Sequence, residues 1–489
     1  MRLWIAVYLT QPSLDALNPL WSDEAAPAVA VLDHEQVVAV TPEARRLGVR
    51  PGMRKKSAGA VAPHASFIQR DAEREQQLLK AASLAMLQYT PDVAFGPEAS
   101  LLLEVGPSLR AFGGPASLCR RIRRSMGELG CQSRLGMAPT ALGAWLLAAR
   151  ATPGPRRVLR LPALVRNLGN IPCTLLPAAR PHREWLEGIG CRTLAALLRL
   201  PRAGMQRRCG PDLLRSIDQA YGHHPEVFEW IRPPLDFSAR IELLARIEHA
   251  PAVLTVARRL IQQLAGWLNA VQAAVCAVVL VLEHERGRHA RPPTRLSIAP
   301  ADPEWQPDHL LHLLKEHLGR LSLQAPVIAV GLQTDRLAPR EPAPDDLFIE
   351  PGGEPAREGR LLDLLTARLG PGQVLAARPQ ADHRPEAANR WLPALGPFRS
   401  AATAENFSAE RPFWLLQRPI PLVMREHRPY YGTPLRILRG PERIEAGWWD
   451  GSPISRDYFV AESEDKIRYW IYLDRSLKEP RWYLHGLYA

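Results

Sequence analysis

The chain has 489 residues, of which 46% are hydrophobic, and a formal net charge of +12. Its length argues against a single core and predicts three or four domains, because one domain typically holds about 100 to 200 residues. No apolar run reaches the roughly 18 residues of a membrane-spanning helix. The excess of cations favours a polyanionic partner such as nucleic acid.

The six cysteines, at 119, 131, 173, 191, 209 and 276, are spread singly along the chain. No CxxC pair occurs and no histidine stands at ligand spacing from any of them, so we expect free thiols and no metal site. The chain opens on a strand-like segment and not on a signal peptide. We therefore expect a cytoplasmic protein without a membrane partner.

Residues 1 to 155 alternate apolar strands with amphipathic helices, which predicts a mixed α/β layer. The expected strands are 3–9, 28–32, 36–40 and 100–105, and the expected helices are 71–89, 115–129 and 139–150. The Pro- and Gly-rich stretch Ala151–Pro155 ends this pattern. A short helical region is expected from 156 to 235.

Residues 236 to 336 are predicted to form a second sheet in the order β-α-β-β-α-β, with two helices on one face. The expected elements are a strand from about 238, helix 250–269, strands 272–284 and 294–299, helix 307–320 and strand 325–334. Residues 337–390 are expected to be a Pro-rich connector that contains a helix at 358–369 and otherwise has little periodicity.

Residues 391–489 hold most of the tyrosines of the chain and nearly half of its tryptophans. Alternating aromatic segments predict a small β region here. The aromatic side chains form either the core of that region or a surface that binds partners.

A helix-hairpin-helix candidate lies between residues 186 and 198. Gly188 and Gly190 flank Ile189 in a tight turn ahead of a predicted helix, where backbone N–H groups and the helix dipole can receive a phosphate. Arg192 and Thr193 add side-chain donors. We predict DNA binding at this hairpin, and the alternative is an ordinary structural turn.

The order of these parts resembles the Y-family translesion DNA polymerases over residues 1 to 336: palm and fingers, a helix-hairpin-helix thumb, then a little finger. The most specific match is 42–53, similar to the fingers motif Y-E-A-R-x-x-G-V-x-x-G-M. In active members the Tyr and Arg of this motif contact the incoming triphosphate. Here Arg45 remains, and Pro42 stands at the Tyr position. The resemblance implies an α+β multidomain fold with an added aromatic-rich C-terminal β region.

The family motifs that bind metal and triphosphate are present without their charged residues. The positions of the missing carboxylates and lysines are, in chain order, Tyr8, Thr10, Ala99, Ser100, Ala141 and Trp145. Two-metal phosphoryl transfer needs at least two carboxylates that converge on ions about 3.5–4 Å apart. We therefore expect no catalytic residues, no metal, no cofactor and no polymerase activity.

Within the family this pattern is similar to the ImuB group, the catalytically inactive homologues of a bacterial mutagenesis cassette. The resemblance implies a DNA-binding adaptor in damage-induced (SOS) translesion synthesis, DNA repair and mutagenesis. Its implied partners are the sliding clamp, a RecA-related protein of the ImuA kind and an error-prone polymerase of the replicative C family. Clamp binding uses a peptide similar to Q-L-[SD]-L-F, for which Asp346, Leu347 and Phe348 are the candidate, without the leading Gln.

Two alternatives remain open. The chain could be an active Y-family DNA polymerase whose displaced acids, such as Asp15, Glu98 or Glu104, hold magnesium. Against this, Asp15 is expected in a loop, and Glu104 lies about 13 Å along its strand from Ser100. The chain could also be a general DNA-binding or repair protein that uses its hairpin alone, without clamp or polymerase partners.

Overall fold

The computed structural model describes residues 2–17, 28–285, 291–340, 355–395, 411–476 and 479–488. The chain divides into two compact units, Met1–Leu364 and Leu365–Ala489. No described helix is long and apolar enough to cross a membrane. The clamp-binding candidate Asp346, Leu347 and Phe348 lies outside the described residues.

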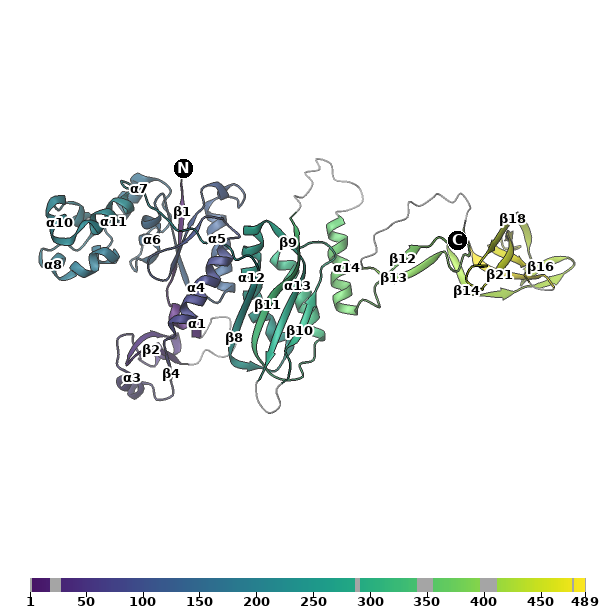
Figure 1. Cartoon of the computed structure of the whole chain (residues 1–489), viewed down its shortest axis with the longest axis horizontal. Coiled ribbons are helices and arrows are strands. Elements are labelled where there is room, and N and C mark those ends of the chain that lie inside the picture. Colours follow the sequence, from purple (N-terminus) through teal and green to yellow (C-terminus); the bar gives the residue numbers. More distant parts are fainter. Residues whose placement is uncertain are drawn as a thin grey trace. The chain divides into compact units, whose positions relative to one another are not determined.

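The first unit opens with an antiparallel sheet in the strand order β5-β6-β1-β7, which we call the palm sheet. Its strands are β1 (Trp4–Leu9), β5 (Val93–Phe95), β6 (Ser100–Glu104) and β7 (Ser133–Ala138). Helices α4 (Ala72–Met86) and α5 (Pro115–Glu128) cover one face, and α6 (Ala141–Ala149) covers the other (Figure 1). β1 is apolar throughout because its alternate residues meet different helices: Ile5 and Val7 pack with α4 and α5, and Trp4 and Ala6 with α6.

A glycine sets the distance between α6 and the sheet. A Cβ atom at Gly136 on β7 would lie 2.1 Å from the carbonyl oxygen of Ala144. No residue with a side chain fits there, so the helix lies directly on the strand.

A smaller layer, the fingers region, contains β2 (Val29–Asp33), β3 (Gln36–Val40) and β4 (Ser66–Gln69) in the order β3-β2-β4. Helices α2 (Pro42–Arg46) and α3 (Lys55–Val61) belong to the same layer, and α1 (Pro12–Leu17) follows β1. The sequence predicted β2 and β3 but not the short elements β4, β5, β7 and α1 to α3. The missed elements are short, and sequences such as Ser133–Ala138 of β7 show neither an apolar run nor a clear apolar alternation.

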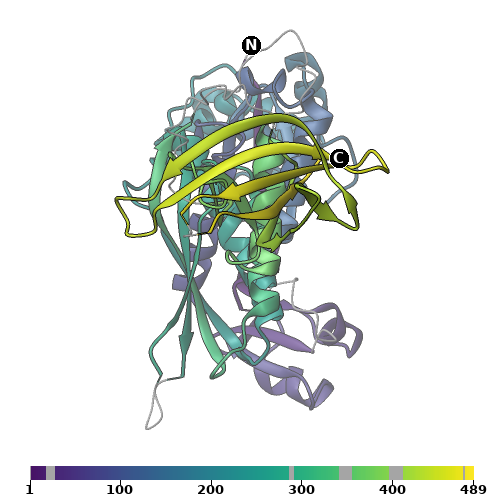
Figure 2. The ribbon, with the colours of Figure 1, turned by 90° about the vertical axis from the view of Figure 1, so that its right-hand side faces the viewer.

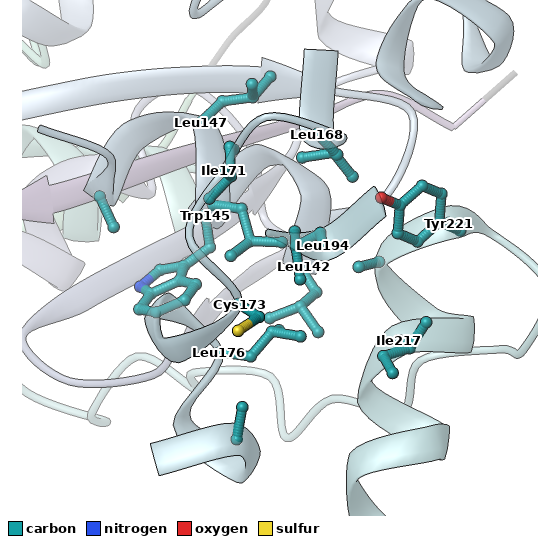
Figure 3. Packing of buried hydrophobic residues seen from close by; sticks show 14 of the residues in the cluster. Leu142, Trp145, Leu147, Leu168, Ile171, Cys173, Leu176, Leu194, Ile217 and Tyr221 are labelled. Atoms are coloured by element: carbon teal, nitrogen blue, oxygen red, sulfur yellow. The ribbon is translucent and has the colours of Figure 1, made fainter. Parts of the chain in front are cut away.

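The predicted helical region is a cluster of short helices, which we call the thumb region. These are α7 (Leu161–Leu168), α8 (Arg183–Gly188), α9 (Leu194–Leu198), α10 (Arg202–Cys209) and α11 (Pro211–Tyr221), with the 3-10 segment η3 (Pro177–His182). All nine residues of α6 are buried, because this helix packs on the sheet and also shares one core with the thumb region. Figure 3 shows Leu142 and Trp145 of α6 beside Leu168, Ile171 and Leu194 of the thumb region.

The predicted order β-α-β-β-α-β of the little-finger region is confirmed. The elements are β8 (Ser238–Ile247), α12 (Val253–Val271), β9 (Ala273–His284), β10 (Thr294–Ile298), α13 (Pro307–Arg320) and β11 (Val327–Pro339), and the sheet order is β10-β9-β11-β8. The sheet is separate from the palm sheet, but the region is not independent of the palm. Helix α12 packs on α4 so closely that a Cβ atom at Gly266 would lie 1.9 Å from the carbonyl oxygen of Leu84.

The second unit begins within α14 (Pro355–Leu369) and continues with a hairpin of β12 (Leu375–Pro379) and β13 (Asn389–Pro393). The sequence predicted little regular structure around this hairpin. That prediction was wrong because both strands are largely exposed and lack apolar alternation.

A five-stranded sheet in the order β14-β21-β20-β19-β18 forms the body of the second unit (Figure 2). The strands after residue 410 are β14 (Trp414–Pro421), β15 (Val423–Arg425), β16 (Arg428–Tyr431), β17 (Thr433–Pro434), β18 (Arg436–Ala446), β19 (Ile454–Glu462), β20 (Arg468–Asp474) and β21 (Arg481–Leu487). The structure confirms the core interpretation for some of the aromatic residues, and partner binding by the exposed ones stays a prediction. Tyr458 and Trp470 are buried in the core, and Trp448 and Trp449 are exposed.

Candidate functional site

Strand pairing brings together three of the positions that the sequence resemblance assigns to missing carboxylates. Tyr8 on β1 lies opposite Ser100 on β6, and the N–H of Leu9 donates to the carbonyl of Ala99 at 2.9 Å. Thr10 lies past the end of β1, where its hydroxyl donates to the carbonyl of Gln132 at 3.3 Å. Tyr8, Ala99 and Ser100 therefore share one place in the sheet, and Thr10 is bound toward β7.

The residues at these positions form a neutral hydrogen-bonded group. The carbonyl of Pro97 accepts a hydrogen bond from the Ser100 hydroxyl at 2.5 Å and another from the indole N–H of Trp145 at 3.1 Å. The ring of Trp145 also meets Tyr8 edge-on at a centroid distance of 6.5 Å. The serine at a carboxylate position and the tryptophan at a lysine position thus bind the same backbone oxygen.

Glu98, the nearest acid to this group, is paired with a thumb residue. Its carboxylate lies 2.5 Å from the guanidinium of Arg180 on η3, and its φ of 55° is in the left-handed region that non-glycine residues seldom adopt. Burial raises the pKa of Tyr8, and the negative charge and hydrogen bond of Glu98 raise it further. The tyrosine is therefore a neutral hydroxyl at ordinary pH.

The other two acids considered as displaced ligands lie elsewhere. Asp15 is buried in α1, where its Oδ2 accepts the N–H of Gln132 at 2.8 Å, and burial raises its pKa to about 7. The prediction that Asp15 lies in a loop was wrong. Glu104 lies opposite Trp4 at the far end of β6, and its Oε1 accepts the N–H groups of Leu3 and Gly106 at 3.2 and 3.1 Å.

These acids do not converge. Among the described residues, no group of three or more His, Cys, Asp or Glu side chains could hold a metal ion. The arrangement offers hydrogen bonding and one ion pair at the palm, and no cluster of carboxylates.

The fingers motif forms a capped helix. Thr41 caps α2 by accepting the N–H of Ala44 at 3.3 Å, and Pro42 stands in the first turn. Arg45 is exposed on this helix. The arginine that the family uses on the triphosphate is therefore accessible to an anion.

The predicted helix-hairpin-helix turn is present between α8 and α9. Gly190 has a φ of 72°, and Ile189 is 47% exposed at the tip of the turn. Gly188 ends α8, and Thr193 caps α9 by accepting the N–H of Ala196 at 3.3 Å.

Most backbone donors of this hairpin already have partners within the chain. The N–H groups of 189, 190 and 191 donate back to α8, and those of 194 and 195 donate to the carbonyls of Ile171 and Gly169. Among the described residues, the donors of the hairpin that remain for a ligand are the N–H groups of Arg192 and Thr193 and the exposed guanidinium of Arg192.

The arginines near the hairpin fall into two classes. Arg202 is paired with Asp218 through both of its terminal nitrogens, at 3.0 and 2.5 Å. In the described part of the chain no carboxylate pairs with Arg192, Arg207 or Arg208, although Arg208 lies over the ring of Trp185 at 6.0 Å. The hairpin side of the thumb region thus offers uncompensated positive charge to a polyanion.

The chain is similar to several known proteins. Residues 22–149 match the impB/mucB/samB family. The chain is similar over nearly its whole length to Protein ImuB of Caulobacter vibrioides, strain NA1000 / CB15N, with 25% identity over 475 residues that cover 91% of this chain and all of that protein. This similarity confirms the resemblance to the ImuB group that the sequence motifs indicated.

Proteins named as DNA polymerases are also among the relatives. DNA polymerase IV 2 of Mesorhizobium japonicum is 27% identical over 206 residues, which cover 42% of this chain and 48% of that protein. The solved ternary complex of Dbh is 17% identical and aligns with 68% of this chain and 98% of its own, with a TM-score of 0.38. The expected fold class, α+β with Y-family polymerase-like parts and an extra C-terminal β region, is confirmed.

Sequence reasoning missed the contacts that tie the thumb region to the palm. The carboxylate of Glu226 accepts the N–H groups of Ala141 and Leu142, both at 2.8 Å, at the start of α6. Arg180 reaches Glu98 across a similar sequence distance. No local pattern marks either pair, because the partners are more than 80 residues apart.

Proposed function

We propose that this chain is a non-catalytic adaptor of translesion synthesis, active in the cytoplasm in damage-induced mutagenesis. It binds DNA and links the sliding clamp, an ImuA-like RecA-related protein and an error-prone C-family polymerase. The similarity to Protein ImuB over 91% of the chain supports this role.

The observation that carries the proposal is the neutral group at the palm. Ser100 and Trp145 stand where the family has a carboxylate and a lysine, and both donate to the carbonyl of Pro97. Glu98 is paired with Arg180. A chain that transferred phosphoryl groups would need free carboxylates in this place, because the metal ions supply the charge stabilisation of the reaction.

DNA binding is assigned to the hairpin residues Gly188, Ile189, Gly190, Arg192 and Thr193. Of these, Arg192 and Thr193 offer the free donors. Binding is expected to be independent of base sequence and to weaken steeply with salt, since each neutralised phosphate contributes about 0.9 to the log-log slope on duplex DNA.

Primer extension by the purified chain tests the non-catalytic role, with magnesium and then manganese, beside a binding measurement on the same labelled primer-template. We expect binding without extension. Extension that co-purifies with the protein would establish the alternative, an active polymerase with displaced metal ligands.

The partner assignment needs its own measurement. Replacement of both Leu347 and Phe348 by alanine is expected to abolish capture by the sliding clamp and to leave DNA binding unchanged, because these side chains would fill an apolar pocket on the clamp. Unchanged capture would reject this segment as the clamp-binding site. Wild-type protein that binds DNA but captures no clamp would favour a general DNA-binding protein.

A further inference from the structure

Arg150, the residue that follows α6, is a buried cation with no described carboxylate paired to it. It is 5% exposed, and its Nε and Nη2 atoms are buried without a hydrogen-bond partner. Burial lowers the pKa of its guanidinium, and the positive charge of Arg156 lowers it further. An arginine keeps its proton in proteins, so an isolated buried guanidinium is costly unless an anion compensates it.

The side chains of two further arginines bind the backbone carbonyl of Arg150. Arg134 on β7 donates from Nη1 to the carbonyl oxygen of Arg150 at 2.9 Å, and Arg156 donates from Nη2 to the same oxygen at 3.3 Å. The Nε of Arg156 is also buried without a partner. No salt bridge joins any of these three arginines to an acid in the described ranges, and the positive charge of Arg156 acts on the guanidinium of Arg150.

Other arginines of this chain have carboxylates close to them. Arg70 is held by Glu75 and Asp33. Arg259, which is also buried, is in the electrostatic range of Asp15. Arg70 is exposed, and the buried Arg259 also has an Nε without a hydrogen-bond partner. Arg150 differs from both because, among the described residues, the charge that acts on its guanidinium is that of another arginine and not of a carboxylate.

A thin surface loop covers Arg150. A Cβ atom at Gly154, whose φ is 144°, would lie 2.8 Å from the Nη2 of Arg150, so the backbone of this residue lies directly on the guanidinium. Residues 151–155 are all exposed. Arg156 is fixed behind this loop, since its carbonyl accepts the N–H of Met137 on β7 at 2.7 Å. A ligand would reach Arg150 at this exposed loop, and Arg134 and the backbone of Arg156 are held on β7.

The group borders the palm position described above, because the guanidinium carbon of Arg134 lies 5.9 Å from the ring centre of Tyr8. We propose that Arg134, Arg150 and Arg156 form a metal-independent phosphate-binding site beside the palm. The planar guanidinium fork matches phosphate oxygens, and several such forks bind one phosphate more strongly than a single cation does. A nucleic-acid backbone and a free nucleotide share this chemistry.

Thermal unfolding of the full chain in EDTA tests the site, with inorganic phosphate compared with chloride at equal ionic strength. The variants are Arg150→Met and Arg156→Met, and the matched control is Arg70→Met, which removes an arginine that has carboxylate partners. We expect phosphate to raise the Tm of the wild type and of Arg70→Met but not of the two other variants. In chloride, Arg150→Met should be at least as stable as the wild type, whereas Arg70→Met should be less stable.

The reverse pattern would overturn the site: an equal phosphate shift in all four proteins, or Arg150→Met destabilised as much as Arg70→Met in chloride. Arg156→Met keeps the test decisive if Arg150→Met fails to fold, because Arg156 is only partly buried. A phosphate shift that persists in Arg156→Met would then reject the proposal.

Two binding arms distinguish the sources of phosphate, both in EDTA: a labelled single-stranded oligonucleotide and a fluorescent deoxynucleoside triphosphate. About tenfold weaker oligonucleotide binding by Arg150→Met, with unchanged nucleotide binding, assigns the site to the DNA backbone, and the salt slope should fall by about 0.9 for each lost contact. Selective loss of the nucleotide assigns it to the triphosphate, and loss of neither rejects the site.

The inference extends the proposed DNA-binding role, but the two fail separately. A wild type that binds no DNA contradicts the adaptor role, and the phosphate shift remains measurable. Intact DNA binding in Arg150→Met without any phosphate effect rejects this site alone.

Discussion

Gly266 on α12 lies where the little-finger region meets the palm, and its replacement by alanine tests that contact. The new Cβ would lie 1.9 Å from the carbonyl oxygen of Leu84, 2.8 Å from its carbonyl carbon and 2.9 Å from the Cα of Ala85. All three atoms are backbone of α4, so no side-chain rotation relieves the overlap. Ordinary contact begins near 3.4 Å, and the helices must separate by roughly 1.5 Å, an overpacking that costs about 1–3 kcal/mol.

Separation also breaks polar contacts between the same helices. The side chain of Asn269 donates to the carbonyl of Leu87 at 3.0 Å, and Gln88 donates to Gln262 at 3.4 Å. Each lost hydrogen bond costs about 0.5–1.5 kcal/mol. We therefore expect Gly266→Ala to lower the free energy of unfolding, or of detaching the little-finger region, by about 2–6 kcal/mol.

Denaturant unfolding followed by tryptophan fluorescence measures this loss, and amide hydrogen exchange in α4 and α12 locates it. Gly319→Ala is the control: this exposed residue of α13 has nothing within 4 Å of a new Cβ. Alanine there should stabilise the helix by up to about 1 kcal/mol. A Gly266→Ala protein as stable as Gly319→Ala, with unchanged exchange, would refute the close packing of α12 on α4.

Two further predictions concern buried titratable groups. Burial lowers the pKa of His485 to about 4, below the ordinary value near 6.5, so the second unit should lose up to about 3 kcal/mol of stability as the pH falls from about 6.5 to 4. Acid unfolding can be followed by the fluorescence of Trp470, which stacks on His485 at a centroid distance of 5.9 Å. A His485→Asn variant with the same pH dependence would contradict the assignment. Glu226→Ala leaves the N–H groups of Ala141 and Leu142 without their acceptor and should lower the free energy of unfolding by about 1–3 kcal/mol. Glu226→Gln keeps one acceptor and should lower it less. Equal unfolding midpoints for the two variants would show that the hydrogen bonds to α6 contribute nothing.

Much of the fold could be read from local patterns. Strands β1 and β6, helices α4 to α6 and the whole little-finger order follow from apolar periods of two and 3.6 residues, which depend only on neighbours in sequence. The short strands β5 and β7 could not be predicted in this way, although they complete the palm sheet.

The candidate site divides in the same way. The missing carboxylates at Tyr8 and Ser100 are visible in the sequence because each motif is a short local pattern. Ser100 and Trp145 bind one backbone oxygen, and Trp145 also contacts the ring of Tyr8. These contacts depend on how β1, β6 and α6 are placed in the fold, which no local pattern reveals. Which donors of the hairpin are already bonded likewise depends on a distant segment, the carbonyls of Gly169 and Ile171 after α7.

By itself the sequence determined an excess of positive charge, and it predicted polymerase-like parts and palm motifs without their acids. Only the tertiary structure decided that Glu98 is paired with Arg180, that Gly266 admits a backbone from a distant helix and that Arg150 lies buried with other arginines. The physical reason is range. A residue's identity fixes its charge and shape, but the groups that compensate that charge or meet that shape come from segments tens to hundreds of residues away, and only folding brings them together.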